Sequence, residues 1–174
     1  MLGISSAQLE SLQTRGQMLS AIRIVAFDPS ITATGWAVMN YAGRRIEKLD
    51  SGEWHPSTAK SARDRYDQLA DFARKIIEPI TDDTFIVIEL PSGGQRHSAK
   101  QLMSYARAIG VIEGVANQCC PDRSIRVQVN GWKGNKPKET TMREVEWITK
   151  HKPRTHNEAD AIGLALWFIG QRGN

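Results

Sequence analysis

Residues 24–39 read IVAFDPSITATGWAVM, two apolar runs separated by a polar turn. The first run begins at Ile22 and is short, β-branched and almost continuously apolar, as expected of a buried strand. It ends at Asp28-Pro29, because proline cannot donate a hydrogen bond to a sheet ladder. A second strand is predicted over residues 35–40. The fold therefore opens on a strand pair whose first member ends in an aspartate.

The rest of the chain extends this pair into a mixed sheet. The further predicted elements are a strand over residues 45–54, a helix over 61–78, a strand over 84–89, a helix over 99–117, a strand over 125–129 and helices over 139–150 and 158–170. The order is βββαβαβαα. A meander followed by strand–helix units predicts an α/β fold, with a five-stranded mixed sheet and helices on both faces.

Composition limits the class of protein. The 174 residues fit one domain, with 40% hydrophobic and 24% charged residues. We predict an extension over residues 1–21, either a short helix or an expression remnant, and the functional domain over 22–174. No apolar run is long enough to span a membrane, and the start lacks the pattern of a signal peptide. Adjacent Cys119 and Cys120 indicate neither a metal motif nor a structural disulfide. We expect a reduced, cytoplasmic protein.

Positive charge is concentrated in the middle of the chain. Residues 1–90 hold 10 Lys/Arg against 12 Asp/Glu, residues 91–155 hold 12 against 5, and residues 156–174 hold 1 against 2. The balances are −2, +7 and −1, which sum to the net charge of +4. A basic middle segment indicates a surface that faces a polyanion such as nucleic acid, or else a solvated helix face.

Three acidic residues lie next to segments expected to form the core. Asp28 ends the first strand, Glu89 ends the fourth strand, and Asp160 lies in the apolar terminal helix. Each has an ordinary explanation taken alone, as a turn former, a cap or partner of Arg96, or a residue favoured by the helix dipole. Buried charges are costly unless they are paired or bind a metal.

Together these three residues indicate a metal site. If the first and fourth strands are parallel neighbours, Asp28 and Glu89 lie side by side, and a carboxylate on a helix across that end completes a cluster. Converging carboxylates are usually neutralised by a hard divalent cation such as Mg²⁺. Two such ions about 3.5–4 Å apart would support phosphodiester hydrolysis.

Five segments, taken in order, carry a resemblance to a known family. They are residues 24–39, FIVIELPSGGQ (85–95), HSAKQLMSYARAIGVIEGVA (97–116), VNGWKGNKPKETTMREV (129–145) and HNEADAIGLALW (156–167). Over residues 22–170 the chain resembles the RuvC family of Holliday junction resolvases, in the RNase H-like superfamily. The resemblance implies a Mg²⁺-dependent endonuclease (Mn²⁺ substituting) that acts as a homodimer on four-way or branched DNA. The helix within residues 97–116 would contribute to the dimer interface.

The resemblance also assigns the site residues. Asp28, Glu89 and Asp160 match three of the family's four metal ligands, and Lys138 matches a lysine near the active site. Asn157 stands at the fourth position, where the family has Asp or His. Three explanations are open: a substitution that traps an uncleaved complex, a natural asparagine with altered metal use, or replacement of the ligand by His156.

Basic and aromatic residues complete the predicted site. The predicted phosphate contacts are Lys100, Arg107, Lys133, Lys136, Lys138 and Arg143. The loop after Glu89 lacks the aromatic residue that resolvases often stack on a base, so Trp132 is the candidate for stacking, or else packs beneath its loop. The remaining tryptophans are predicted to pack in the core: Trp36, Trp54, Trp147 and Trp167.

Two other functions stay open. One is another nuclease of the same fold, such as an RNA–DNA hybrid nuclease or a transposase core. The other is a catalytically weak junction-binding protein, because Asn157 departs from the family's ligand set.

Overall fold

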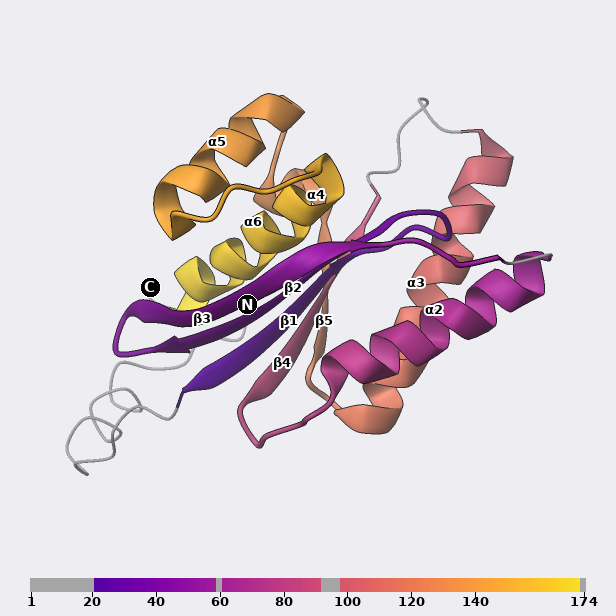
Figure 1. Cartoon of the computed structure of the whole chain (residues 1–174), viewed down its shortest axis with the longest axis horizontal. Coiled ribbons are helices and arrows are strands. Elements are labelled where there is room, and N and C mark those ends of the chain that lie inside the picture. The colour runs from indigo at the N-terminus through magenta and orange to yellow at the C-terminus, as the bar shows by residue number, and fades with distance from the viewer. Residues whose placement is uncertain (1–20, 59–60, 92–97, 173–174) are drawn as a thin grey trace.

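The fold is built on one sheet with strand order β3-β2-β1-β4-β5 (Figure 1). The computed structural model describes residues 21–58, 61–91 and 98–172. The strands are β1 (Ile22–Asp28), β2 (Thr34–Ala42), β3 (Arg45–Trp54), β4 (Thr84–Leu90) and β5 (Ser124–Gln128). β1 pairs antiparallel with β2 and parallel with β4, β2 pairs antiparallel with β3, and β4 pairs parallel with β5. The predicted mixed five-stranded sheet is confirmed.

Helices cover both faces of the sheet, as predicted. α2 (Ala62–Ile77) and α3 (Ala99–Cys119) pack on one face, and α5 (Lys138–Thr149) and α6 (His156–Arg172) lie on the other (Figure 1). Alternate residues of β1 point to the two layers, with Val25 and Phe27 in the α2–α3 core and Ile24 and Ala26 in the α6 core. The near-continuous apolar run in β1 therefore reflects burial on both faces.

The boundaries of two helical segments differ from the prediction. The single turn α4 (Val129–Trp132) lies where a loop was predicted. α6 begins at His156, two residues earlier than expected, because the Thr155 hydroxyl accepts a hydrogen bond from the Glu158 amide at 3.2 Å. This contact caps the first turn and satisfies one of its free N–H groups.

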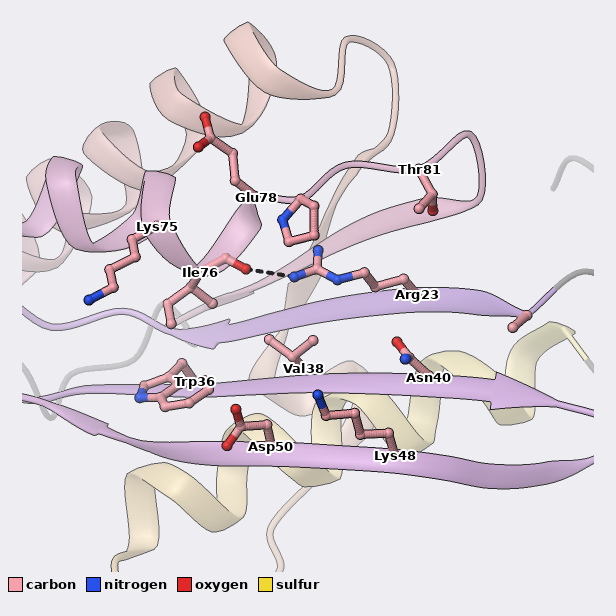
Figure 2. Close-up of a pocket in the computed structure, with 12 residues that line it drawn as sticks. Arg23, Trp36, Val38, Asn40, Lys48, Asp50, Lys75, Ile76, Glu78 and Thr81 are labelled. Atoms are coloured by element: carbon pink, nitrogen blue, oxygen red, sulfur yellow. Dashed lines mark hydrogen bonds between the residues drawn. The ribbon is translucent and has the colours of Figure 1, made fainter.

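Arg23 on β1 ties the sheet to the carboxyl end of α2. Its guanidinium donates hydrogen bonds to the carbonyl oxygens of Ile77 at 2.7 Å and Ile76 at 2.8 Å, and Figure 2 marks the latter. Beside this contact lies an open hollow of about 450 Å³ between β2, β3 and the end of α2. The last carbonyls of a helix have no intrahelical partner, so Arg23 closes this end of α2.

The tryptophan predictions are confirmed for three residues and wrong for one. Trp36 and Trp54 both contact the Phe72 ring, and Trp167 packs against the α6 core. Trp147 was predicted to be packed but is 75% exposed on α5, where Lys150 lies 5.3 Å from its ring centroid. Helical spacing alone could not tell which face of α5 meets α6.

Residues 1–20 lie outside the described part, so the proposed extension and the domain division stay predictions. Cys119 and Cys120 are free thiols. Within the described ranges, the helices are all too short or too polar to cross a bilayer.

Candidate active site

Two of the predicted acidic residues lie side by side at one edge of the sheet. β1 and β4 run parallel with Phe27 opposite Ile88, so the next residue on each strand is acidic, Asp28 and Glu89 respectively. Both carboxylates therefore leave the carboxyl ends of adjacent strands, as the sequence predicted. The parallel register of the two strands thus brings these charges together.

The third acidic residue reaches the same edge from the helical layer. α6 packs across β1 and β2, and its second turn carries Asp160, which is 7% exposed. Glu89 is 9% exposed. Asp160 raises the pKa of both Asp28 and Glu89 through charge repulsion, so the three carboxylates form one electrostatic cluster. The structure thus unites the three residues that the sequence singled out.

The cluster makes its own ionisation unfavourable. Burial, followed by the charges of Glu89 and Asp160, raises the pKa of Asp28 well above its ordinary value. Burial and the charge of Asp160 raise the pKa of Glu89 from 4.5 to about 7. Desolvation and like-charge repulsion are the two effects that push carboxyl pKa values upward. Carboxyl groups whose pKa is raised by burial and by a neighbouring charge are often found at functional sites.

Two residues of the basic segment point into this cluster. Lys133 is 8% exposed, and its Nζ lies 2.5 Å from both Oδ1 and Oδ2 of Asp160. The neighbouring Trp132 donates a hydrogen bond from Nε1 to Oε2 of Glu89 at 2.8 Å. Both residues were predicted to contact DNA. In the structure their side chains contact the carboxylates of Asp160 and Glu89. Their contact with DNA stays a prediction.

Asn157 lies at the start of α6 and links this helix to the turn between β1 and β2. Its Nδ2 donates a hydrogen bond to the carbonyl oxygen of Ala33 at 3.1 Å. That oxygen can only accept, so the amide nitrogen must face it and Oδ1 must face away. An aspartate at this position would set one carboxylate oxygen against the carbonyl. The asparagine therefore suits its surroundings and keeps one oxygen free to act as a ligand.

The close approach of α6 to β2 requires a glycine. Gly35 lies opposite Asp28 in the β1–β2 pair, and a Cβ at Gly35 would overlap the backbone carbonyl of Asn157. Replacement of the Asn157 ligand by His156 was expected only if α6 began later than predicted. Because α6 begins at His156, that condition is not met.

A buried carboxylate that sequence reasoning missed anchors the start of α6. Glu158 is 1% exposed and accepts hydrogen bonds from the Ser51 hydroxyl at 2.8 Å and the Arg154 amide at 2.7 Å. His151 Nε2 lies 3.1 Å from the same carboxylate. Burial alone would raise the pKa of Glu158, but these hydrogen bonds and the Arg154 charge hold it below its ordinary value. The only sequence signal was a Thr155-x-x-Glu158 spacing typical of a helix start.

The other predicted site residues are exposed. They are Lys138 and Arg143 on α5, Lys136 before it, and Lys100 and Arg107 on α3. Lys138 is close enough for its charge to lower the pKa of Asp28, which agrees with a position near the active site. Lys136 pairs with Glu144 at 2.7 Å on the surface. Arg96, the alternative partner of Glu89, lies outside the described residues.

The oxygen atoms of the acidic cluster and of Asn157 are of the kind that a hard divalent cation binds. The three carboxylates are not arranged around one point in this structure. Three carboxylates and an amide oxygen are the ligands that Mg²⁺ accepts, and their mutual repulsion would be relieved by a cation. In the described part of the chain, no three carboxylate, imidazole or thiolate groups are arranged to hold a metal. Two of these carboxylates have other partners in the structure, Asp160 with Lys133 and Glu89 with Trp132.

Comparisons with known proteins lead to one family. No family model matches the chain. It is 23% identical over 159 residues to the crossover junction endodeoxyribonuclease RuvC of Rhodopseudomonas palustris (strain TIE-1), covering 87% of this chain and 89% of that protein. It is 21% identical over 166 residues to RuvC of Bartonella bacilliformis, covering 90% and 96%.

The fold agrees with these relatives. The solved structure of Thermus thermophilus RuvC in complex with a Holliday junction substrate matches with a TM-score of 0.72 and 18% identity, covering 88% of this chain and 97% of that one. The chain is thus similar to RuvC in sequence over most of its length and in its fold.

Proposed function

We propose that this protein is a structure-selective endonuclease that resolves four-way or branched DNA by metal-dependent phosphodiester hydrolysis. The observation that carries the proposal is the meeting of Asp28, Glu89 and Asp160 at one edge of a RuvC-type sheet. The relatives are named crossover junction endodeoxyribonucleases, and one structural neighbour binds a Holliday junction. The exposed basic residues near this edge supply the positive surface that DNA requires.

The chain's own residues have distinct tasks in this reaction. Asp28, Glu89, Asp160 and the free Oδ1 of Asn157 would hold Mg²⁺, with Mn²⁺ as a substitute. A divalent ion held there would activate water and neutralise charge that develops on the phosphate. Lys138, at the start of α5, is positioned to offset charge on the scissile phosphate. These assignments follow the donor chemistry of the residues at this edge of the sheet.

The active form that we propose is a homodimer. Leu102 and Met103 on α3 are 37% and 56% exposed, an apolar surface on the helix that the resemblance assigns to the dimer interface. A two-fold dimer would present two sites to a junction with matching symmetry, so that paired nicks fall in equivalent strands. Contacts with phosphates would come from Lys100, Arg107, Lys136 and Arg143, which position DNA without reading its sequence.

The test compares three proteins on a labelled four-way junction, on linear duplex of the same sequence and on an RNA–DNA hybrid of that sequence. They are the unaltered chain, Asn157→Asp and Asp28→Asn, each measured for binding and for cleavage with Mg²⁺, with Mn²⁺ and with EDTA. We expect the unaltered chain to bind the junction preferentially and nick it in symmetric pairs. Asp28→Asn should bind equally well but lose at least about 10³-fold in cleavage rate, since a metal ligand is lost.

The other outcomes separate the open alternatives. Cleavage by Asn157→Asp alone would identify the chain as a trapped form of the enzyme. Junction binding by all three proteins without cleavage would favour a junction-binding protein. Preference for an RNA–DNA hybrid would favour another nuclease of this fold. Binding to the junction no tighter than to duplex would refute the resolvase function.

A further inference from the structure

Lys133 is a buried cation in a loop that otherwise lies at the surface. It follows the single turn α4 and precedes Gly134, whose left-handed backbone (φ 62°) lets the chain turn back to the surface. A lysine on such a turn could extend into solvent at little cost. Instead its ammonium is 8% exposed and meets both oxygens of Asp160 at 2.5 Å.

The ammonium neutralises the cluster in the way that a metal ion would. Its charge lowers the pKa of both Asp28 and Glu89, opposing the effects of burial and repulsion. Trp132 beside it holds Glu89 through Nε1 and packs its ring over α6 at Gly163, where a Cβ would come within 2.8 Å of the ring. The Trp132–Lys133 pair thus fixes two of the three carboxylates.

The same contacts place a positive charge where a metal would have to bind. Both carboxylate oxygens of Asp160 contact the Lys133 ammonium, and one oxygen of Glu89 accepts a hydrogen bond from the Trp132 indole. No three acidic, imidazole or thiolate groups of the described chain converge on one point. A cation bound by Asp28, Glu89 and Asp160 would therefore lie close to the Lys133 ammonium and share the Asp160 carboxylate with it.

We propose that Lys133 is a built-in counter-cation that holds the metal-free site together and competes with the divalent ion for Asp160. This inference rests on the proposed metal-dependent function. Like charges within a few ångströms exclude one another at a buried site, so ammonium and metal cannot both contact Asp160 without a loss of affinity. Lys133 is a positioning residue here, because it acts on the ligands and not on the reacting atoms.

The experiment titrates the metal-free full-length protein with Mn²⁺ and measures the free ion by electron paramagnetic resonance, without DNA. Lys133→Met removes the competing charge and should raise Mn²⁺ affinity about tenfold or more. Lys133→Gln retains a donor to Asp160 without the charge, and should also bind Mn²⁺ more tightly. Lys133→Arg retains the charge and should show no gain. The matched control is Lys136→Met, which removes an equal charge from the same loop but from the surface pair with Glu144.

Thermal unfolding gives a second readout. In EDTA, Lys133→Met should unfold at a lower temperature than the unaltered chain, because three carboxylates lose their counter-charge. Saturating Mn²⁺ should raise its midpoint by more than it raises that of the unaltered chain. If Lys133→Met does not fold in EDTA, the Mn²⁺ titration of Lys133→Gln decides alone.

Two failures are distinguishable. If the unaltered chain does not bind Mn²⁺, or if Asp28→Asn binds it equally well, the metal site of the proposed function is refuted. If it binds Mn²⁺ there but the Lys133→Met and Lys133→Gln variants gain no more affinity than Lys136→Met, only the competition by Lys133 is refuted.

Discussion

Single residues at the sheet edge carry charge that the fold holds at a cost. Asp28 and Glu89 both have raised pKa values, and burial is the first cause for each. A carboxyl group whose pKa is raised on folding holds its proton more tightly in the folded state than in the unfolded state. The acidic site therefore opposes folding at a pH where all its carboxylates are ionised.

This leads to a pH dependence with a defined sign. The pKa of Glu89 lies at about 7 in the folded chain against an ordinary value of 4.5, so the folded state holds more protons between those values. The free energy of unfolding of the metal-free protein should fall as pH rises from about 4.5 to about 7. Glu89 alone would contribute up to about 3 kcal/mol to this fall. Denaturant unfolding in EDTA at several pH values measures it.

The control for this prediction is Glu89→Gln, which removes the titrating group but retains a similar shape. Its stability should change less with pH over the same range. A pH dependence as steep as that of the unaltered chain would show that Glu89 is not the group that titrates.

Not every residue of the site could be predicted from the sequence. Asp28, Glu89 and Asp160 were found because each interrupts an apolar segment, which is a local signal. Lys133 was placed among surface phosphate contacts, since its partner lies 27 residues further along the chain. The partner of Trp132 is 43 residues away. Local sequence does not record which of many carboxylates a lysine or an indole will meet.

At the scale of elements, the contact between β2 and the start of α6 sets the spacing of the site. Gly35 lies against the backbone of Asn157 in the same turn-to-helix contact that the Asn157 amide makes with Ala33. The Thr155 cap and the buried Glu158 hold the first turn of α6 in place from the other side. Small shifts of this turn would move Asp160 relative to the strand carboxylates.

Gly35→Ala adds only one methyl group but should disturb the site. The added methyl group would overlap the Asn157 carbonyl, and backbone atoms cannot yield as a flexible side chain can. We expect a loss of about 1–3 kcal/mol in the free energy of unfolding and at least about tenfold weaker Mn²⁺ binding. Calorimetric titration with Mn²⁺ and denaturant unfolding measure the two effects.

Gly170→Ala is the matched control. Gly170 lies on α6, the helix that Gly35 contacts, and nothing lies within 4 Å of a Cβ there. It should leave metal affinity unchanged. Unaltered Mn²⁺ binding in Gly35→Ala would mean that α6 can shift without moving its ligands.

The carboxyl end of α2 provides a prediction on stability alone. Arg23 donates to the carbonyl oxygen of Ile76, as Figure 2 shows, and to that of Ile77. Arg23→Met would retain the aliphatic packing and lose both charged hydrogen bonds, for a loss of about 1–3 kcal/mol in urea unfolding. Arg45→Met is the control, because Arg45 has an exposed side chain and only a 3.9 Å contact with Glu47. Equal stability of the two variants would contradict the capping role.

At the scale of the whole molecule, the proposed paired cleavage of a junction requires two copies of the site. Met103→Glu would place a charge on the exposed apolar surface of α3 and should weaken the proposed dimer at least about tenfold. Light scattering after size exclusion should give a monomer mass at a concentration where the unaltered chain gives a dimer. Paired nicks should disappear with it.

Ile148→Glu is the control for this surface, since Ile148 is 50% exposed on α5, outside the proposed interface. It should remain dimeric. Dissociation by Ile148→Glu and not by Met103→Glu would assign the interface to α5 instead.

The sequence by itself determined the order of strands and helices, the burial of β1 and β4 and the three acidic residues. These features depend on hydrophobic period and on residues that break it, which are properties of neighbours along the chain. Tertiary structure alone decided that Lys133 and Trp132 face the acidic cluster, that Asn157 is tied to Ala33 and that Trp147 lies in solvent. Those outcomes depend on which surfaces meet when the layers pack, and residues far apart in sequence supply both sides of each contact.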